Sequence, residues 1–193
     1  KLKNVYGDIR DLESLKKSIK NFKPDLVFHL AAQPIVLDSY KRPIYTFNTN
    51  VIGTANLLES CIGISNLKSI VIITTDKCYE NIDAKYSFKE DDKLGGDDPY
   101  SASKAASEIV VNSYSKSFLS KIGVATVRAG NVIGGGDRGK DRLVPDIIQA
   151  IKKNKRLSLR NPNSTRPWQH VFETINGYTL LSEKLYFNKK KYS

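Results

Sequence analysis

Short apolar runs alternate with longer stretches of helical periodicity along this chain, and that alternation is the feature that most constrains its fold. The runs are continuously apolar, without the alternating pattern of a half-exposed strand, which is typical of strands in a parallel sheet buried on both faces. We therefore predict an α/β fold, a doubly wound parallel sheet covered by helices on both faces. The predicted strands are DLVFHL at 25–30, SIVIITT at 69–75 and VATVRAG at 124–130. The predicted helices span residues 11–22, 43–62, 99–118, 144–152 and 173–186.

Helical spacing also predicts which side chains share a helix face. The first helix places its apolar residues on one face, with Leu12, Leu15, Ile19 and Phe22. The second does so with Ile44, Phe47, Val51, Ala55, Leu58 and Ile62. In the third, the residues predicted to point inward are Ala102, Ala106, Ile109 and Val110.

Each predicted strand ends in small or polar residues. In open parallel sheets, ligands bind in the crevice outside the carboxyl ends of the strands. Three adjacent strand ends would therefore face one crevice, which makes them the first candidates for a site. The residues at these ends are Ala31, Ala32 and Gln33, then Asp76 and Lys77, then Gly130 and Asn131.

Length and composition indicate one globular domain. The 193 residues are 40% hydrophobic, enough for one core and too few for two comfortable domains. No apolar run approaches the roughly 20 residues of a membrane span, and the opening KLKNVYGDIRD is no secretory leader, so no membrane partner is predicted. Cys61 and Cys78 form no CxxC pair and no metal-ligand spacing, so we predict no metal site and a reducing, cytoplasmic setting.

The net charge of +11 is unevenly distributed. Residues 1–137 hold 18 Lys and Arg against 16 Asp and Glu, whereas residues 138–193 hold 13 against 4. A basic half opposite a neutral half suits an anionic ligand such as a phosphate at one end of the molecule, although a solvated basic surface would account for part of the excess. The chain has no basic-aromatic interleaving, so no nucleic-acid partner is predicted.

Tyr100 and Lys104 lie one helical turn apart in DDPYSASKAASE, where Asp97 or Asp98 can cap a helix that starts at Pro99. A nearby ammonium favours the phenolate, so it would lower the phenol pKa from about 10 toward neutrality and allow the phenolate to accept a proton. Thr75 adds a hydroxyl at a neighbouring strand end. Together these groups suit oxidation of a carbinol with hydride transfer to a nicotinamide, because no side chain accepts a hydride.

Thr75, Tyr100 and Lys104 together resemble the catalytic set of the extended short-chain dehydrogenase/reductase superfamily. Further matches to its nucleotide-sugar members are GDIRD at the end of a third strand, HLAAQ at a fourth, and NVIGTANLLE on the next helix. Four motifs together resemble the CDP-glucose 4,6-dehydratase branch. They are TTDKCYEN, DPYSASK, VRAGNVIGGGD and RNPNSTRPWQHV.

The resemblance implies an incomplete Rossmann-like sheet with part of a smaller substrate-binding region. Residues 1–134 would form the cofactor and catalytic portion, and residues 135–193 part of the nucleotide-sugar binding region. The superfamily begins with a strand and a GxxGxxG turn that holds the cofactor pyrophosphate, which this chain lacks, since Gly134–Gly136 follows a late strand. With no Met anywhere, the chain is expected to be a fragment that is itself inactive and binds NAD poorly.

For the full-length parent, the resemblance implies a lyase that converts CDP-glucose to CDP-4-keto-6-deoxyglucose. Tyr100 would take the C4 hydroxyl proton and Asp76 would protonate the departing C6 hydroxyl. Two roles are open to Lys77, because an ammonium cannot accept a proton. Either burial discharges it and it acts as base at C5, or it stays charged, positions Asp76 and stabilises the enolate.

The resemblance also implies the binding residues. The expected NAD contacts are Asp8, Ile9, Leu30, Ala31, Ala32, Thr49, Tyr100 and Lys104. The expected contacts to the sugar nucleotide are Pro34, Thr75, Asn131, Leu143, Arg160 and Arg166, where guanidinium suits the pyrophosphate. The full-length parent is expected to be a homo-oligomer.

Other interpretations remain open at this point. A nucleotide-sugar 4-epimerase needs Tyr100 and Lys104 but not Asp76 with Lys77, and a non-catalytic nucleotide-sugar binding relative needs none of them. Without the resemblance, Ala31 and Ala32 suit simple close packing. His29 and Cys78 are predicted to be buried packing residues, while Trp168 and His170 suit either a pocket wall or the core.

Overall fold

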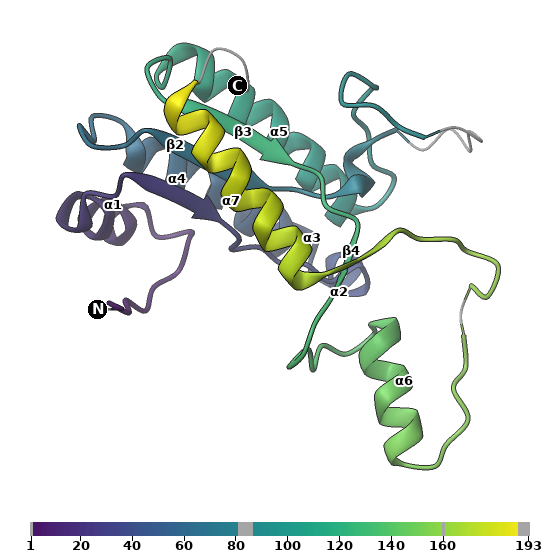
Figure 1. Cartoon of the computed structure of the whole chain (residues 1–193). Coiled ribbons are helices and arrows are strands. Elements are labelled where there is room, and N and C mark those ends of the chain that lie inside the picture. Colours follow the sequence, from purple (N-terminus) through teal and green to yellow (C-terminus); the bar gives the residue numbers. More distant parts are fainter. Residues whose placement is uncertain (1, 81–86, 160, 189–193) are drawn as a thin grey trace.

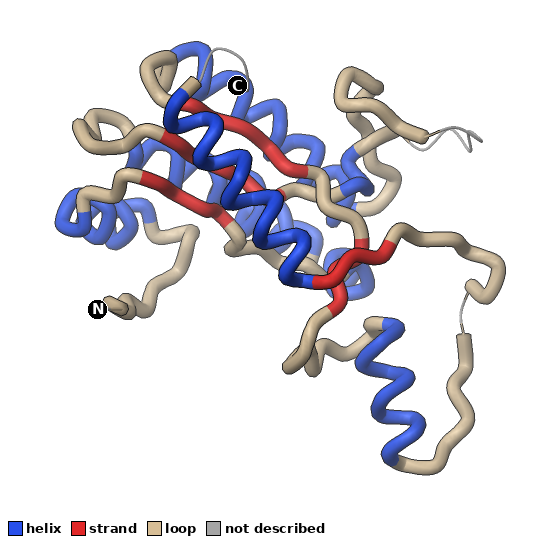
Figure 2. Tube along the Cα trace, in the orientation of Figure 1, coloured by secondary structure: helices blue, strands red, loops and turns tan. Residues whose placement is uncertain are grey.

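The computed structural model describes residues 2–80, 87–159 and 161–188 (Figures 1 and 2). The helices are α1 (Leu12–Phe22), α2 (Val36–Lys41), α3 (Pro43–Phe47), the π-helix η1 (Asn48–Ile52), α4 (Gly53–Cys61), the 3-10 helix η2 (Asp76–Cys78), α5 (Pro99–Ser117), α6 (Leu143–Lys152) and α7 (Val171–Phe187). The strands are β1 (Leu26–His29), β2 (Ser69–Ile73), β3 (Gly123–Val127), β4 (Asn131–Ile133) and β5 (Trp168–His170).

The three predicted strands form one parallel sheet in the order β1-β2-β3. Val27 pairs with Ile70, and Ile70 pairs with Val124, so the three apolar runs lie in register. The carboxyl ends of the strands consequently meet at one edge, as predicted. The described residues of the GDIRD segment form no strand, which corrects the expectation taken from the resemblance. A strand needs a hydrogen-bonding neighbour, and among the described residues β1 pairs only with β2.

Helices cover both faces of the sheet, with α7 on one face and α1, α4 and α5 on the other (Figure 1). The α7 face is held by a buried hydrogen bond between Ser69 Oγ and Ser182 Oγ at 2.6 Å. Gly123 allows α7 to approach the sheet, since a Cβ there would lie 2.8 Å from the Leu185 carbonyl oxygen. The predicted doubly wound α/β architecture is thus confirmed, and α7 contributes to it although it lies within residues 135–193.

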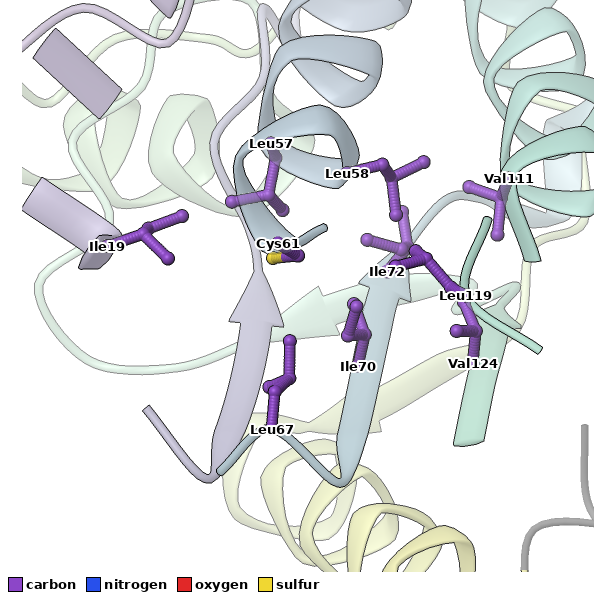
Figure 3. Close-up of a cluster of buried hydrophobic side chains, with 10 residues drawn as sticks. All are labelled: Ile19, Leu57, Leu58, Cys61, Leu67, Ile70, Ile72, Val111, Leu119 and Val124. Atoms are coloured by element: carbon purple, nitrogen blue, oxygen red, sulfur yellow. The ribbon is translucent and has the colours of Figure 1, made fainter. Parts of the chain in front are cut away.

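The main apolar core lies between the sheet and the α1–α4–α5 layer (Figure 3). Ile70 and Ile72 project from β2 into this layer, where Leu58 of α4 and Val111 of α5 meet them. Burial of such side chains contributes roughly 1.5–3 kcal/mol each. The remaining members of the cluster are Ile19, Leu57, Cys61, Leu67, Leu119 and Val124.

The predicted helix over 43–62 is interrupted by the π-helix η1, and its buried face therefore differs from the prediction. A π turn closes i→i+5 hydrogen bonds and shifts the phase of every residue after it. Ile44 and Ile62, predicted on the apolar face, are 71% and 39% exposed. Of the predicted face, Leu58 is buried as expected, and Phe47, Val51 and Ala55 are half-buried. The buried residues are Thr46, Thr49, Asn50, Gly53, Thr54, Leu57, Leu58, Ser60 and Cys61.

The inward face of α5 also differs from the prediction. Asp98 caps this helix by accepting a hydrogen bond from the Ser101 amide, and Pro99 occupies its first position, as expected. Ile109, however, is 61% exposed. The side facing the protein is mostly small and polar, which lets α5 lie close to η1 through hydrogen bonds such as Asn50 Nδ2 to Ser103 Oγ at 2.8 Å. Its buried residues are Ser101, Ser103, Lys104, Ala105, Ser107, Glu108 and Val111.

Four elements outside the predicted ranges were not anticipated from periodicity, namely α2, η2, β4 and β5, all of six residues or fewer. β4 and β5 pair with each other in a separate two-stranded sheet. From there the chain leads to α6, which stands apart from the sheet and its covering helices in Figure 1. No helix in the described part of the chain has both the length and the apolar character needed to cross a membrane.

His29 is buried at the end of β1, as predicted, with its Nε2 3.1 Å from Thr54 Oγ1. Burial, followed by the positive charge of Lys104, lowers the pKa of His29 from 6.5 to about 4. Below pH 6.5, His29 binds a proton in the unfolded chain but stays neutral in the folded chain. The free energy of unfolding therefore falls as the pH drops from 6.5 to 4.

We therefore expect the chain to lose about 2 kcal/mol more unfolding free energy between pH 7 and pH 5 than a His29→Gln variant does. Urea titrations of both proteins at the two pH values measure this difference. Parallel losses in the two proteins would show that His29 does not control the acid sensitivity.

Candidate active site at the carboxyl ends of the strands

The polar residues that follow β2 form a short, pinned turn. Thr75 caps η2 by accepting a hydrogen bond from the Lys77 amide, and its hydroxyl donates to Asp76 Oδ1 at 3.1 Å. The Asp76 amide donates to the Ala129 carbonyl at 3.1 Å, beyond the end of β3. Thr75 is buried, while Asp76 and Lys77 are half-buried and so remain accessible.

The first turns of α5 bring Tyr100 and Lys104 to the same strand end. The Tyr100 side chain hydrogen bonds with that of Thr75. Lys104 Nζ donates to the carbonyl oxygen of Ile73, the last residue of β2, at 2.9 Å. All five predicted catalytic residues therefore gather around the end of β2.

The electrostatics of this pair differ from the sequence expectation. Burial lowers the pKa of Lys104 to about 8. Burial also raises the pKa of Tyr100, and this outweighs the opposing hydrogen bond with Thr75 and the positive charge of Arg142. The expected lowering of the Tyr100 pKa by Lys104 is thus wrong for this structure, because Lys104 is directed to the Ile73 carbonyl and the phenol is largely desolvated.

A cavity of about 1050 Å³ opens beside the turn that follows β2. Asp76 and Lys77 line it on one side, and Arg166 lines it from the loop before β5. Arg166 is exposed, and its guanidinium donates a hydrogen bond to the carbonyl of its own neighbour, Thr165, at 2.8 Å. A guanidinium that lines the same cavity as Asp76 and Lys77 could hold an anionic group of a molecule bound there.

The loop that precedes α1 borders a second cavity, of about 530 Å³. Asp8 lines it, and the Arg10 guanidinium beside Asp8 holds the pKa of that carboxyl at about 2. Ile9 lies over Gly53, where a Cβ would be 2.7 Å from Ile9 Cγ2. The Asn56 side chain donates to the Ile9 carbonyl at 3.1 Å, so this loop is fixed to α4.

The segment after β1 is fixed to the π-helix η1. The Gln33 amide donates to Asn50 Oδ1 at 2.8 Å, which places Leu30, Ala31 and Ala32 close in sequence to an anchored residue. Leu30 is 62% exposed, Ala31 and Pro34 are also exposed, and Ala32 is half-buried. Their open position corresponds to a binding edge more than to the close packing considered for Ala31 and Ala32.

Thr49, in the middle of η1, is 8% exposed. Its hydroxyl is the one buried side-chain oxygen or nitrogen among the described residues that has no hydrogen-bond partner. An unpaired buried hydroxyl is costly unless another molecule supplies the partner, and π-helical turns occur frequently at functional sites.

The remaining predicted substrate residues are less closely grouped. Asn131 begins β4, and its amide donates to the Pro167 carbonyl at 3.1 Å, next to Arg166. Leu143 begins α6, is 43% exposed and is not among the residues that line the cavity. Arg160 lies outside the described residues. Trp168 and His170 are exposed on β5, so neither is a core residue.

Two charged residues at this site were missed by the sequence analysis. Glu108 of α5 and Arg128, just after β3, form an ion pair at 2.5 Å, with side chains 5% and 16% exposed. A signal for Glu108 was present, because it follows Lys104 by one more helical turn. Cys78 contacts the same carboxylate at 3.4 Å, and burial raises its thiol pKa to about 12, which fits the predicted buried role.

Known proteins share both the sequence and the fold. The chain is 48% identical over its whole length to a CDP-glucose 4,6-dehydratase from Salmonella typhimurium and covers 55% of that protein. It is 31% identical to a dTDP-D-glucose 4,6-dehydratase from Dictyostelium discoideum, over 92% of the chain and 43% of the relative. The chain thus spans about half the length of the curated relatives that it matches.

Solved structures agree with these relatives. A dTDP-glucose 4,6-dehydratase from Streptomyces venezuelae, crystallised with NAD, superposes with a TM-score of 0.82 at 28% identity, over 92% of this chain and 53% of that one. A UDP-glucose 4-epimerase from Thermotoga maritima shares the fold, with a TM-score of 0.83 at 23% identity, over 92% of this chain and 58% of that one. A profile of the family described as GDP-mannose 4,6 dehydratase matches residues 1–190, and the chain therefore belongs to that family.

Proposed function

We propose that the full-length protein containing this chain is an NAD-dependent lyase that converts CDP-glucose to CDP-4-keto-6-deoxyglucose. The observation that carries the proposal is the arrangement around β2, where Thr75 contacts Tyr100 and the next two residues, Asp76 and Lys77, face a cavity shared with Arg166. The 48% identity to a CDP-glucose 4,6-dehydratase supports the choice of nucleotide.

The described residues fit a nicotinamide dinucleotide at the β1 side of the sheet edge. Thr49 offers a buried hydroxyl without a partner, and the cavity beside Asp8 and Ile9 would take the adenine end. Leu30, Ala31 and Ala32 would line the cofactor, with Tyr100 and Lys104 at its reacting end. When bound, NAD would supply the hydride acceptor at C4 of the sugar and the hydride donor at C6.

The chain's own groups handle the protons of the oxidation. Tyr100 accepts the proton of the C4 hydroxyl, and the Thr75 hydroxyl, once turned from Asp76 Oδ1 to the phenol oxygen, would donate a hydrogen bond that favours the phenolate. Lys104, with its pKa lowered to about 8, carries a positive charge in most molecules at neutral pH. Its ammonium would stabilise the phenolate on a closer approach than the Ile73 carbonyl permits in this structure.

Elimination of water requires a second set of groups. Once C4 is a ketone, the C5 proton is acidic, and Asp76 delivers a proton to the departing C6 hydroxyl. Lys77 either removes the C5 proton as a neutral amine or, as an ammonium, positions Asp76 and stabilises the enolate. Both roles place it beside Asp76 on the cavity wall, where the structure has it.

The substrate's pyrophosphate would lie against the basic half of the chain. Arg166 lines the same cavity as Asp76 and would bind the pyrophosphate bidentately. Asn131, next to the Pro167 carbonyl, and Leu143 would lie near the pyrophosphate or nucleotide, together with Arg160. Pro34 and Thr75 would contact the sugar.

Incubation of the full-length protein with NAD and CDP-glucose tests this proposal. We expect a product that has lost one water and carries a C4 ketone and a C6 methyl group, identified by mass spectrometry and proton NMR. UDP-glucose, dTDP-glucose and GDP-mannose serve as competing substrates. A product isomeric with CDP-glucose would identify a 4-epimerase, and faster turnover of another nucleotide sugar would reject CDP-glucose as substrate.

A further inference from the structure

The buried carboxylate of Glu108 holds both ends of the turn that carries the candidate elimination residues. Its Oε1 accepts a hydrogen bond from Thr74 Oγ1 at 2.6 Å, on the residue before Thr75. The same oxygen accepts from Cys78 Sγ at 3.4 Å, on the residue after Lys77. Thr75, Asp76 and Lys77 are therefore bracketed by two contacts to one side chain.

Glu108 connects this turn to the helix of the oxidation residues. It lies on α5, one turn after Lys104, on the same buried face. That helix also places Tyr100 at the strand end. One rigid element thus sets the position of the Tyr100–Lys104 pair and, through Glu108, of the Asp76–Lys77 pair.

Arg128 completes the arrangement and keeps Glu108 charged. Its guanidinium donates to both carboxylate oxygens, with Nε at 2.9 and 3.0 Å and Nη2 at 2.5 Å. Its Nη1 donates to the Glu90 carbonyl at 2.7 Å, and the guanidinium lies 4.6 Å from the centre of the Tyr79 ring. Burial raises the pKa of Glu108, but the hydrogen bonds from Arg128 and Thr74 outweigh it and hold the pKa below its usual value.

A carboxylate used only to neutralise Arg128 would not need the contacts to Thr74 and Cys78. Their presence at the two ends of the reactive turn distinguishes Glu108 from an ordinary buried ion-pair partner. We propose that Glu108 is a positioning residue, held by Arg128, that aligns Asp76 and Lys77 with the sugar whose C4 hydroxyl Tyr100 deprotonates. This inference rests on the proposed function.

The test is Glu108→Gln in the full-length protein, with Glu80→Gln as the matched control. Glu80 makes an exposed ion pair with Lys93 at 2.9 Å, so its loss should leave turnover within about twofold of wild type. For Glu108→Gln we expect kcat with CDP-glucose to fall about 10- to 100-fold, because misplacement of a reacting group by about 1 Å costs that much. The KM values for CDP-glucose and NAD should stay within about threefold, and reduced cofactor should build up during turnover.

A second readout requires no substrate. If Glu108 holds the turn, hydrogen exchange of the Asp76 and Cys78 amides should accelerate at least about tenfold in Glu108→Gln, while the amides of β1 keep their protection. Thr74→Val removes the bracketing hydroxyl, leaves the Glu108–Arg128 pair intact and should show a smaller effect of the same kind, so it tests the inference even if Glu108→Gln does not fold. Thr74→Ser, which keeps the hydroxyl, should restore both exchange and kcat.

The outcomes separate this inference from the proposed function. An inactive wild-type protein rejects the proposed function, whereas the exchange measurement still decides whether Glu108 holds the turn. Wild-type activity on CDP-glucose with unchanged kcat and unchanged exchange in the variants overturns the positioning role. A lowered unfolding midpoint with normal kcat and normal cofactor oxidation state assigns Glu108 to stability alone and overturns it as well.

Discussion

Replacing Tyr100 by Phe in the full-length protein should lower turnover of CDP-glucose about 100- to 10,000-fold, the usual cost of losing a general base. The change keeps the ring that is packed at the start of α5 and removes the hydroxyl that hydrogen bonds with Thr75. Steady-state assays of ketone formation measure the loss. Binding of CDP-glucose, measured by calorimetry, should remain close to wild type because, in the proposed mechanism, the phenol contacts the C4 hydroxyl rather than the pyrophosphate.

The control for this substitution is Tyr40→Phe, since Tyr40 is 62% exposed on α2 and lies outside the proposed site. It should leave turnover unchanged. Near-normal turnover of Tyr100→Phe would show that another group accepts the C4 hydroxyl proton. Equal losses in both variants would indicate a general sensitivity to hydroxyl removal rather than catalysis by Tyr100.

Asp76→Asn should separate oxidation from elimination. The amide keeps the size of the side chain and can still accept the hydrogen bond from Thr75, but it cannot deliver a proton to the departing C6 hydroxyl. Oxidation at C4 depends on Tyr100, Lys104 and Thr75 and should survive. Near-ultraviolet absorbance of reduced cofactor should therefore rise when CDP-glucose is added and should not decay, while product formation falls about 100-fold or more.

Lys77→Ala tests the neighbouring residue by a different signal. Exchange of the C5 proton with solvent deuterium reports enolate formation, and we expect it to slow in this variant. Asp91→Asn, an exposed substitution before the site, is the control for both changes. If Asp76→Asn abolishes cofactor reduction and Lys77→Ala leaves C5 exchange unchanged, the polar end of β2 is structural rather than catalytic.

The sequence by itself determined the arrangement of the sheet and the place of the site. Three continuously apolar runs that alternate with helices are typical of neighbouring parallel strands, and the carboxyl ends of such strands share one edge. The one-turn spacing from Tyr100 to Lys104 follows from helical geometry once Asp98 and Pro99 start the helix. These features depend on residues near one another in the chain, which is why periodicity and capping predicted them.

Tertiary structure decided which helix faces are buried and in which direction the pKa values of the site residues shift. The π turn at Asn48–Ile52 shifted the phase of the following helix, and a pattern read at 3.6 residues per turn cannot register an extra residue. The buried face of α5 is polar because it hydrogen bonds to polar partners such as Asn50, which lies far away in the sequence. Hydrophobic periodicity finds apolar faces and overlooks polar ones that are paired.

The pKa values and the Glu108 contacts show the same limit. Lys104 was expected to lower the pKa of Tyr100, but burial of the phenol raises that pKa, and burial is a property of the folded chain alone. Glu108 meets Thr74, 34 residues before it, and Arg128, 20 residues after it. Burying the charges of Glu108 and Arg128 is tolerable only because the fold brings these two residues and Thr74 together. No local pattern in the sequence predicts contacts between residues so far apart.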